Sequence, residues 1–473
     1  MKQKTTLIML MVLGLSLFLV TGIVAQESQG SEGISGGKTI SLKEFVDLAV
    51  ANDTEFERIL IDELALKYAK DLGLPADDLV LEVRGQYDFM LSQDREEHDS
   101  LVSLSKLFPF TGTSVELGYI NAPSITSLAY SSAFTAEISQ PIARNAFGKA
   151  TRLKDKIIGV EVDVARYQIV EAYEDYLAAI ITGYYDWYEA YENLKIGESS
   201  YNENLRLLDN IKERQKSNIA LPLDVNKIHL QVLAKKEKLI ELEEEYANAL
   251  NFAEKAIRYK SEEDLIPREP DLYRKITIAF EKDFEQFKEA GRTYQVLDLL
   301  EEKSKLEVDE EADDLLPSIN LLVGYIVKGE GLEIEEEDNM VYTGMSMEWP
   351  FGDQVNRAEH ETSKIALRRT KLSNTGTRFQ LHTDIKDIFQ LIGREEQLGA
   401  IAQEKISLAQ SVLEDETENY SFGKVTINDY IQAVNVLDGN RFNQILHDAQ
   451  RRKYMIEWLR LTDQLVSKKD IYK

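Results

Sequence analysis

The sequence predicts an α+β membrane protein in which long coiled-coil α-helices alternate with groups of amphipathic strands. Residues 149–217 and 354–420 keep a helical apolar pattern over their whole length. Residues 79–142 and 318–350 instead contain runs in which apolar and polar side chains alternate with a period of two. The same order of strands, long helix, turn and returning helix occurs twice, which predicts two internal structural repeats.

The chain divides into a leader and these two repeats, with a joint at the sequence Leu265-Ile-Pro267-Arg-Glu-Pro270. The predicted bounds are residues 26–270 for the first repeat, with strands at about 79–142 and a helical hairpin at 149–259, and residues 271–473 for the second, with strands at about 318–350 and a hairpin at 354–466. No long Gly/Ser linker follows residue 40, so we expect one continuous architecture.

Residues 1–25 are predicted to be a secretory signal peptide. Lys2 and Lys4 precede an apolar run, and the small residue Ala25 before Gln26 fits a cleavage site. An uncleaved membrane anchor is the other interpretation, although the apolar run is short for a span of about 20 residues. Either way, the leader predicts that the protein is exported from the cytoplasm.

Composition excludes several classes of function. The formal net charge of −28 argues against binding to nucleic acid, and the absence of cysteine excludes disulfides and thiolate chemistry. The five histidines are scattered, and Glu359-His360-Glu361 lacks the second histidine of a zinc-protease helix. No phosphate loop or nucleophile elbow occurs. We therefore expect neither an enzyme nor a cofactor or metal site.

The first predicted element is one helix that begins after Ser41 and ends near Gly73. Ser41 and Glu44 have the spacing of a capping box. From Leu79 the period changes to two, and one face of residues 79–91 is apolar while the other is charged. A strand half-buried against a soluble core would also fit, but the length matches the roughly 10 residues that cross a membrane in a barrel wall.

The two strand regions differ in size. The segment between Pro75 and Pro141 is twice as long as the segment between Pro317 and Pro350. The first region therefore has room for one extra hairpin, and the number of strands per chain is left open between four and six. Either number is too small to close a barrel with a lumen, so several chains are expected to share one barrel.

The long helices carry a sevenfold apolar seam. In the first, this seam consists of Tyr173, Ile180, Trp187, Leu194, Tyr201 and Leu208. Such spacing is typical of a coiled coil, and we interpret its aromatic residues as packing residues rather than as a cofactor site. At 1.5 Å per residue each long helix would extend on the order of 100 Å.

Each long helix ends in a short turn before a returning helix. Asn218 and Gly423 are residues that tolerate a left-handed backbone, and a new helical pattern with Asp224 or Asp429 in its first turn follows each of them. Thr426 can cap the second returning helix, whereas Pro222 fits the first position of the other. The simplest role of both aspartates is to stabilise a helix start.

These motifs in their duplicated order resemble the TolC-like outer-membrane efflux family, the outer membrane factors of tripartite efflux and type I secretion systems. The resemblance covers nearly all of the mature chain. It is carried by Tyr420-x-x-Gly423-x-x-Thr426-x-x-Asp429 with Ala433, by the weaker copy that ends in Asp224-Val225, and by the strand-to-helix junctions at Pro141 and Pro350.

The resemblance implies a homotrimer with a shared transmembrane β-barrel in the outer membrane, in contact with its lipid, and a periplasmic α-barrel. Such a channel is an exit duct for small molecules or secreted polypeptides. Its partners would be a periplasmic adaptor protein and an inner-membrane pump of the RND, ABC or MFS type. The alternative is a periplasmic or surface coiled-coil scaffold or adhesin without channel activity.

The resemblance also assigns roles at the turns. Asp429 and Gln432 occupy the positions of the pore constriction, where relatives carry two acidic rings; glutamine replaces the second acid here. Asn218, Asp224, Gly423 and Thr426 lie at the hairpin tips, where the adaptor would make contact. Asp429 therefore has two candidate roles, as a helix cap and as a cation-attracting ring.

Overall fold

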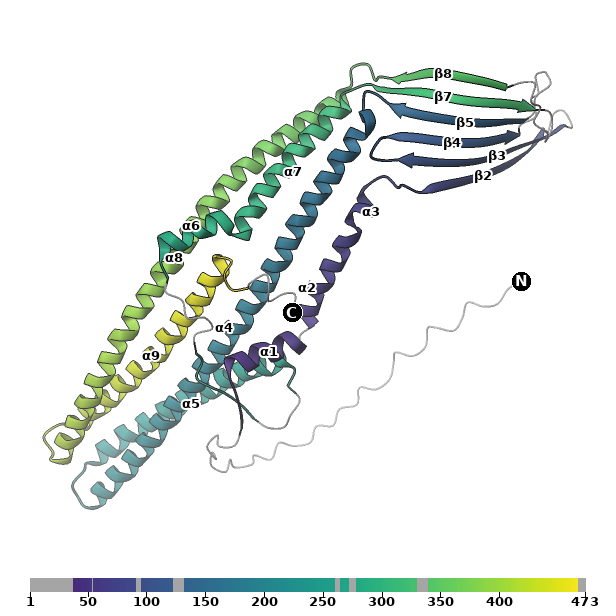
Figure 1. Ribbon diagram of the computed structural model, residues 1–473. Coiled ribbons are helices and arrows are strands. Elements are labelled where there is room, and N and C mark those ends of the chain that lie inside the picture. The colour runs from purple at the N-terminus through teal and green to yellow at the C-terminus, as the bar shows by residue number, and fades with distance from the viewer. Residues whose placement is uncertain are drawn as a thin grey trace, which may run out of the picture.

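The structure is a computed structural model that describes residues 37–52, 54–90, 95–121, 132–259, 264–271, 278–329 and 339–466. The predicted signal peptide, residues 1–25, lies outside them. The chain is elongated, with a sheet at one end and two helical turns at the other (Figure 1). Within the described residues, no helix combines the length and the apolar composition of a membrane span.

The sheet holds six antiparallel strands of the described chain, in the order β2-β3-β4-β5-β7-β8. Their bounds are β2 Leu79–Met90, β3 Arg95–Phe108, β4 Thr113–Asn121, β5 Ser132–Pro141, β7 Ser318–Gly329 and β8 Asn339–Glu348. The open choice between four and six strands is thus decided as six. Because β5 pairs with β7, the two strand regions form one sheet, as Figure 1 shows.

The two faces of the sheet differ in polarity, as the period of two predicts. One row of paired neighbours on the apolar face consists of Leu81, Leu104, Leu117, Ala136, Tyr325 and Val341. The corresponding row on the other face includes Glu82, Ser103, Gly118 and Thr135. Leu81 and Val341 are 64% and 69% exposed, so this apolar face is open to the surroundings.

Two long hairpins form the rest of the rod. They consist of α4 (Lys149–Lys216) with α5 (Pro222–Ile257), and α8 (Gln354–Ser421) with α9 (Ile427–Leu461). α7 (Arg292–Asp314) packs between α4 and α8 near the sheet. Both long helices have 68 residues, close to the predicted bounds. The sevenfold seam is buried except at Tyr201, which is half-buried.

The first predicted helix is wrong as a single element. It is divided into α1 (Leu42–Asn52), α2 (Thr54–Ala65) and α3 (Ala69–Gly73), with a 3₁₀ turn before α3. The division has a physical reason in the tertiary structure, because α1 turns to pack Phe45 against α4. The predicted capping box at its start is confirmed, since the Ser41 hydroxyl donates a hydrogen bond to Glu44 at 2.8 Å.

Three further elements were not predicted from the sequence. The strands β1 (Lys38–Ile40) and β6 (Leu265–Pro267) form a small parallel pair between distant parts of the chain. The helix α6 (Phe280–Ala290) buries Phe284 and Phe287 against α8 and α9. β1 and β6 have three residues each and are too short to show an apolar period, so long-range contacts decide their structure. For α6 a local signal exists, because Phe280, Phe284 and Phe287 have helical spacing.

The largest core lies at the middle of α4. Phe45 of α1 packs against Tyr184 and Trp187, with ring centroids 5.3 and 6.2 Å away, and all three side chains are fully buried. The Tyr184 hydroxyl lies 2.7 Å from the carbonyl oxygens of both Ile40 and Arg268, within hydrogen-bond distance. This contact places the β1–β6 pair on α4, and burial raises the pKa of Tyr184.

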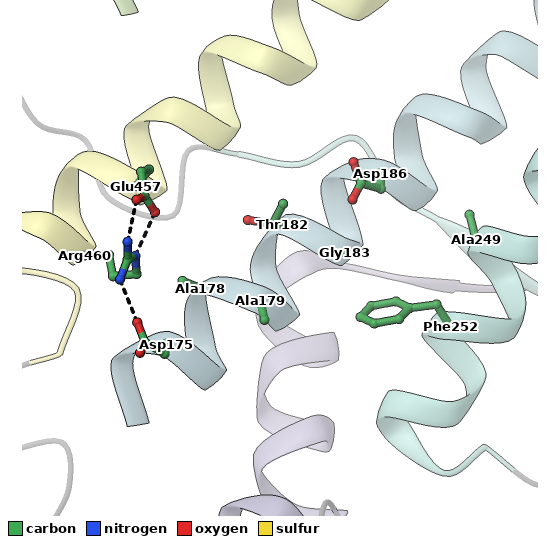
Figure 2. A pocket seen from close by; sticks show the side chains of 10 residues that line it. All are labelled: Asp175, Ala178, Ala179, Thr182, Gly183, Asp186, Ala249, Phe252, Glu457 and Arg460. Atoms are coloured by element: carbon green, nitrogen blue, oxygen red, sulfur yellow. Dashed lines mark hydrogen bonds and ion pairs between the residues drawn. The ribbon is translucent and has the colours of Figure 1, made fainter. Parts of the chain in front are cut away.

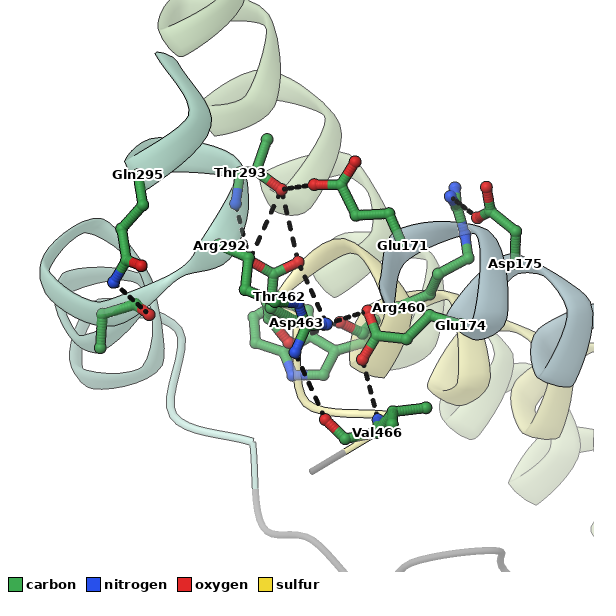
Figure 3. A network of polar contacts seen from close by, with 12 residues as sticks. Glu171, Glu174, Asp175, Arg292, Thr293, Gln295, Arg460, Thr462, Asp463 and Val466 are labelled. Carbon is green, nitrogen blue, oxygen red and sulfur yellow. Dashed lines mark hydrogen bonds and ion pairs between the residues drawn. The ribbon is translucent and has the colours of Figure 1, made fainter. Parts of the chain in front are cut away.

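A buried polar network joins the end of α9 to α4 and α7 (Figure 3). Arg292 of α7 forms ion pairs with Glu174 of α4 and with Asp463, which follows α9. The amide of Val466 donates to Glu174 at 2.8 Å, and the hydroxyl of Thr293 lies between Asp463 and Glu171. The network therefore fixes the chain after α9 against α4 and the start of α7.

The acids in this network outnumber its central cation. Burial raises the pKa of Glu171, Glu174 and Asp463, because a carboxylate is less favourable away from water. A raised pKa in the folded state means that each acid contributes most to stability below its unfolded pKa, near 4. That contribution is lost as the pH rises through the folded pKa.

Glu171→Gln should raise the apparent unfolding temperature at pH 7 and reduce the loss of stability between pH 4 and pH 7, because the neutral amide removes one buried carboxylate. The measurement is thermal unfolding of the detergent-solubilised protein followed by circular dichroism. Asp163→Asn, on an exposed part of α4, is the control. An equal pH profile in Glu171→Gln and wild type would contradict this interpretation.

Candidate functional site

The two hairpin turns lie side by side at the end of the rod opposite the sheet (Figure 1). Asn218 has φ 59° and Gly423 has φ 71°, so both predicted left-handed turn residues are confirmed. A Cβ added at Gly423 would meet no atom within 4 Å, so the positive φ itself is what favours glycine there. The six predicted site residues are thus brought to one end of the molecule, two from the first hairpin (Asn218 and Asp224) and four from the second (Gly423, Thr426, Asp429 and Gln432).

The predicted cap of α9 is confirmed. The hydroxyl and the amide of Thr426 both donate to one carboxylate oxygen of Asp429, at 2.7 and 2.9 Å, while the amide of Asp429 points back to the hydroxyl at 3.4 Å. These hydrogen bonds, with the hydroxyl contributing most, lower the pKa of Asp429. An exposed carboxylate that stays charged therefore stands at the start of α9.

The start of α5 has half of this arrangement. Leu221 replaces the capping threonine, and Pro222 is the first helical residue, as predicted. The carboxylate of Asp224 accepts a hydrogen bond from the amide of Leu221 at 3.1 Å. Asp224 and Asp429 hence occupy the same helical position in their hairpins, which makes each a matched control for the other.

Apolar contacts hold the two tips together. Ile427, the first residue of α9, is buried in a cluster with residues of the other hairpin, namely Leu208, Ile211, Ile228 and Val232. The guanidinium of Arg214 lies 5.0 Å from the ring centre of Tyr420, within the range of a cation–π contact. The turns are therefore not independent loops, since each helix start packs on the neighbouring hairpin.

A polar clasp lies further along the hairpins. We use this name for Asp438 of α9, Lys235 of α5 and Ser200 of α4. Lys235 donates to Asp438 at 2.7 Å, and the Ser200 hydroxyl donates to the same carboxylate oxygen. The Asp438 side chain is only 4% exposed, so its charge depends on these partners. The clasp joins three of the four helices of the two hairpins, namely α4, α5 and α9.

The sequence analysis missed this clasp, although a signal for it exists. Asp438 occupies the same sevenfold position as Ile431, Ile445, Arg452 and Leu459, so charged residues alternate with apolar ones in this row. An acid in that position indicates a buried partner or a register-setting contact. The identity of the partner could not be read from the pattern, because Lys235 lies about 200 residues away in the sequence.

Asp429 and Gln432 share a groove between α8 and α9. The groove has a volume of about 620 Å³, and its other lining residues are Lys405, Leu408, Ala409, Val412, Glu416, Ala433, Val436 and Asn440. Leu408, Val412 and Val436 are exposed in the single chain. The groove therefore combines an apolar floor with polar groups near the turn.

The position of a second cavity indicates on which side of the two hairpins this groove lies. It measures about 550 Å³ and lies between α4, α5 and α9, where Arg460 bridges Glu457 and Asp175 (Figure 2). The ring of Phe252 lies against Gly183, where any side chain would clash with it. The cavity opens on the face of α4 opposite to the one that α1 covers, because its α4 residues are half a helical turn from Tyr184.

Sevenfold spacing relates the groove to that cavity. Asp429, Val436 and Glu457 are separated by multiples of seven residues along α9, so they lie on one side of a supercoiled helix. The groove and the cavity consequently lie on the same side of the two hairpins, which is the side away from α1. Among the described residues, no cluster of His, Asp and Glu is arranged to hold a metal ion.

The comparisons with known proteins give the fold. No protein-family model and no curated protein sequence matches the chain. Solved structures do match: CusC, described with its transmembrane channel formation, has a TM-score of 0.71 at 12% identity over 92% of this chain and 95% of its own. The outer membrane protein VceC of Vibrio cholerae has 0.68 at 12%, over 89% and 95%.

The outer membrane channel CmeC of Campylobacter jejuni agrees with these two, with a TM-score of 0.68 at 12% identity over 90% of this chain and 86% of its own. The chain therefore has the fold of these outer-membrane channels over nearly its whole length. The structural match establishes the fold. At 12% sequence identity it does not establish the activity, which has to be argued from the chain's own residues.

Asp438→Asn should loosen the two hairpins, because Lys235 loses the charge that compensates it. We expect amide hydrogen exchange in the first turns of α9 to accelerate roughly ten-fold, which corresponds to about 1.4 kcal/mol of opening free energy. Asp415→Asn, on an exposed face of α8, is the control. Unchanged exchange in Asp438→Asn would show that the apolar contacts alone hold the tips together.

Proposed function

We propose that the chain is a TolC-like outer-membrane channel, a passive exit duct for small molecules or secreted polypeptides. The observation that carries this proposal is the open sheet: six strands with a bare apolar face and two unpaired edges continue directly into helices of 68 residues. A soluble protein should not expose such a face, whereas lipid on that face and further chains at the edges would cover it.

Exposed aromatic residues support a membrane boundary at the helical end of the sheet. Phe108 and Phe110 lie at the β3–β4 turn, Phe147 precedes α4, and Trp349 and Phe351 follow β8. All five are exposed, Phe351 at 96%. Aromatic side chains at one level of a barrel wall favour the lipid headgroup region. The sheet would then lie in the outer membrane, with the helices in the periplasm.

Apolar stripes on the helices support a homotrimer. On α5 the exposed stripe consists of Leu223, Leu230, Leu233 and Ile240, and on α8 it consists of Ile365, Leu372 and Phe379. The α8 residues are seven apart, and the α5 residues are seven, three and seven apart, as on one face of a coiled coil that lacks its partner. In a ring of copies, these stripes would pack against neighbouring chains and close a periplasmic α-barrel.

We also propose that residues 26–270 and 271–473 are repeats of one plan. Equal lengths support this division, since α4 and α8 have 68 residues each and α5 and α9 have 36 and 35. The sheet is the exception, because the first unit supplies four strands and the second supplies two.

The constriction would form at the hairpin tips. Three Asp429 carboxylates in a ring would attract cations, and Gln432 would line the next level without charge. Asp429 lies on the side of the hairpins away from α1. Its carboxylate would therefore point into the tube if α1 lies on the outside of the tube. Asn218, Asp224, Gly423 and Thr426 would meet a periplasmic adaptor, which connects the duct to an inner-membrane pump.

Asp429→Asn should lower the cation-over-anion permeability ratio by about two-fold or more, because it removes three charges at the proposed constriction while the amide oxygen still accepts the cap hydrogen bond. The measurement is the reversal potential in planar bilayers under a salt gradient. Asp224→Asn, at the matched position of the other hairpin, should leave the ratio unchanged. Equal ratios in wild type and Asp429→Asn would remove this role from Asp429.

The scaffold alternative makes a different prediction about extraction. A channel should remain in the outer-membrane fraction until detergent is added and should then migrate as a trimer, because lipid covers its sheet. Recovery from the periplasm without detergent would favour the scaffold or adhesin. Mild crosslinking of intact envelopes before extraction should also capture an adaptor and a pump, and a trimer without either partner would contradict the proposed assembly.

A further inference from the structure

The first strand region carries a hairpin that its counterpart lacks. β2 and β3 pair over twelve residues and extend the sheet beyond β4. The second strand region supplies only β7 and β8, so this hairpin is the main departure from the repeated plan. We propose that it is part of the barrel wall, so that β2 of one chain pairs with β8 of the next and three chains close an eighteen-stranded barrel. This inference rests on the proposed function.

Continuity of the apolar face is the first argument. Leu81 and Val83 of β2 stand beside Leu104 and Val102 of β3, and the same two rows continue through Leu117 and Tyr119 of β4 and on to β7. A hairpin folded into the lumen or over the rim would not need to match the lipid-facing side of its neighbours. The extra hairpin instead extends the same apolar surface by two strands.

The edges of the sheet are the second argument. Six antiparallel strands leave two edges of opposite direction, so β2 and β8 of adjacent copies would also run antiparallel. The edges are similar in length, with 12 residues in β2 and 10 in β8. Neither contains proline or a bulge that would block pairing. A second copy of this chain therefore fits each edge.

The width of the helical tube is the third argument. Each chain contributes four helices to a given level, in the order α5, α4, α9, α8 near the tips. Four helices packed about 8–10 Å apart cover an arc of roughly 32–40 Å. Six strands about 4.8 Å apart and tilted by about 40° cover roughly 38 Å, whereas four would cover only roughly 25 Å. Six strands thus continue the tube without narrowing it.

This geometry has a consequence for the cargo. A barrel as wide as the tube would place the only constriction at the hairpin tips, where Asp429 and Gln432 lie. Solutes that pass the tips, including polypeptides in an extended or helical form, would leave without a second size filter. The strand number therefore determines where the selectivity of the duct resides.

The absence of cysteine allows a direct test, because introduced pairs will be the only thiols in the chain. Val80→Cys on β2 is combined in turn with Met340→Cys, Gly344→Cys and Ser346→Cys on β8, which share its side of the sheet. After mild oxidation in membranes, one register should give disulfide-linked dimers and trimers. Val80→Cys with Ser105→Cys is the control, since these residues are paired within one chain and should give a monomer.

The four-strand alternative has its own pairs. If β2 and β3 lie outside the wall, β4 becomes the edge, and Glu116→Cys should crosslink to the β8 cysteines of the next chain. That result, or the lack of any β2–β8 crosslink while the trimer stays intact, would overturn the eighteen-stranded barrel and leave the channel proposal standing. Failure to form any trimer in membranes would instead overturn the proposed function.

Discussion

The packing at the middle of α4 is the constraint on which the rest of the structure depends. Tyr184 and Trp187 are buried on a helix of 68 residues that touches α1, α5, α7 and α9. A helix of this length is not stable through its own hydrogen bonds alone, and most of its stability comes from the apolar faces that pack on it. Removing a buried aromatic of this kind typically costs about 3–5 kcal/mol. The same packing positions the sheet at one end of α4 and the turn at the other.

Charged groups are distributed according to their distance from that core. In the centre of the rod, Glu174 and Asp463 are buried around Arg292, and burial raises the pKa of both acids. At the tips, Asp429 is exposed and its cap hydrogen bonds lower its pKa. The charge of a carboxylate is therefore costly in the interior of the rod and is favoured at the exposed start of α9, where hydrogen bonds stabilise it.

Local patterns predicted much of the fold. Interactions between residues within two helical turns of each other determine several of its features. These are the bounds of α4 and α8, the left-handed turn residues Asn218 and Gly423, and the cap at Thr426. The division of the first helix did not follow, because it depends on the contact of α1 with α4. The helix α6 was missed although its phenylalanines have helical spacing. The clasp at Asp438 shows the limit at the site: the seam revealed an unusual residue, but only the fold revealed Lys235 and Ser200 as its partners.

The sequence by itself determined the alternation of long helices and two-faced strands, because period and capping are properties of neighbouring residues. It also determined that one chain could not close a barrel. Only the tertiary structure decided that six strands form one sheet, that β5 adjoins β7, and that Asp438 meets Lys235 and Ser200. These features depend on which segments meet across hundreds of residues, and the energy of such contacts leaves no periodic trace in the sequence.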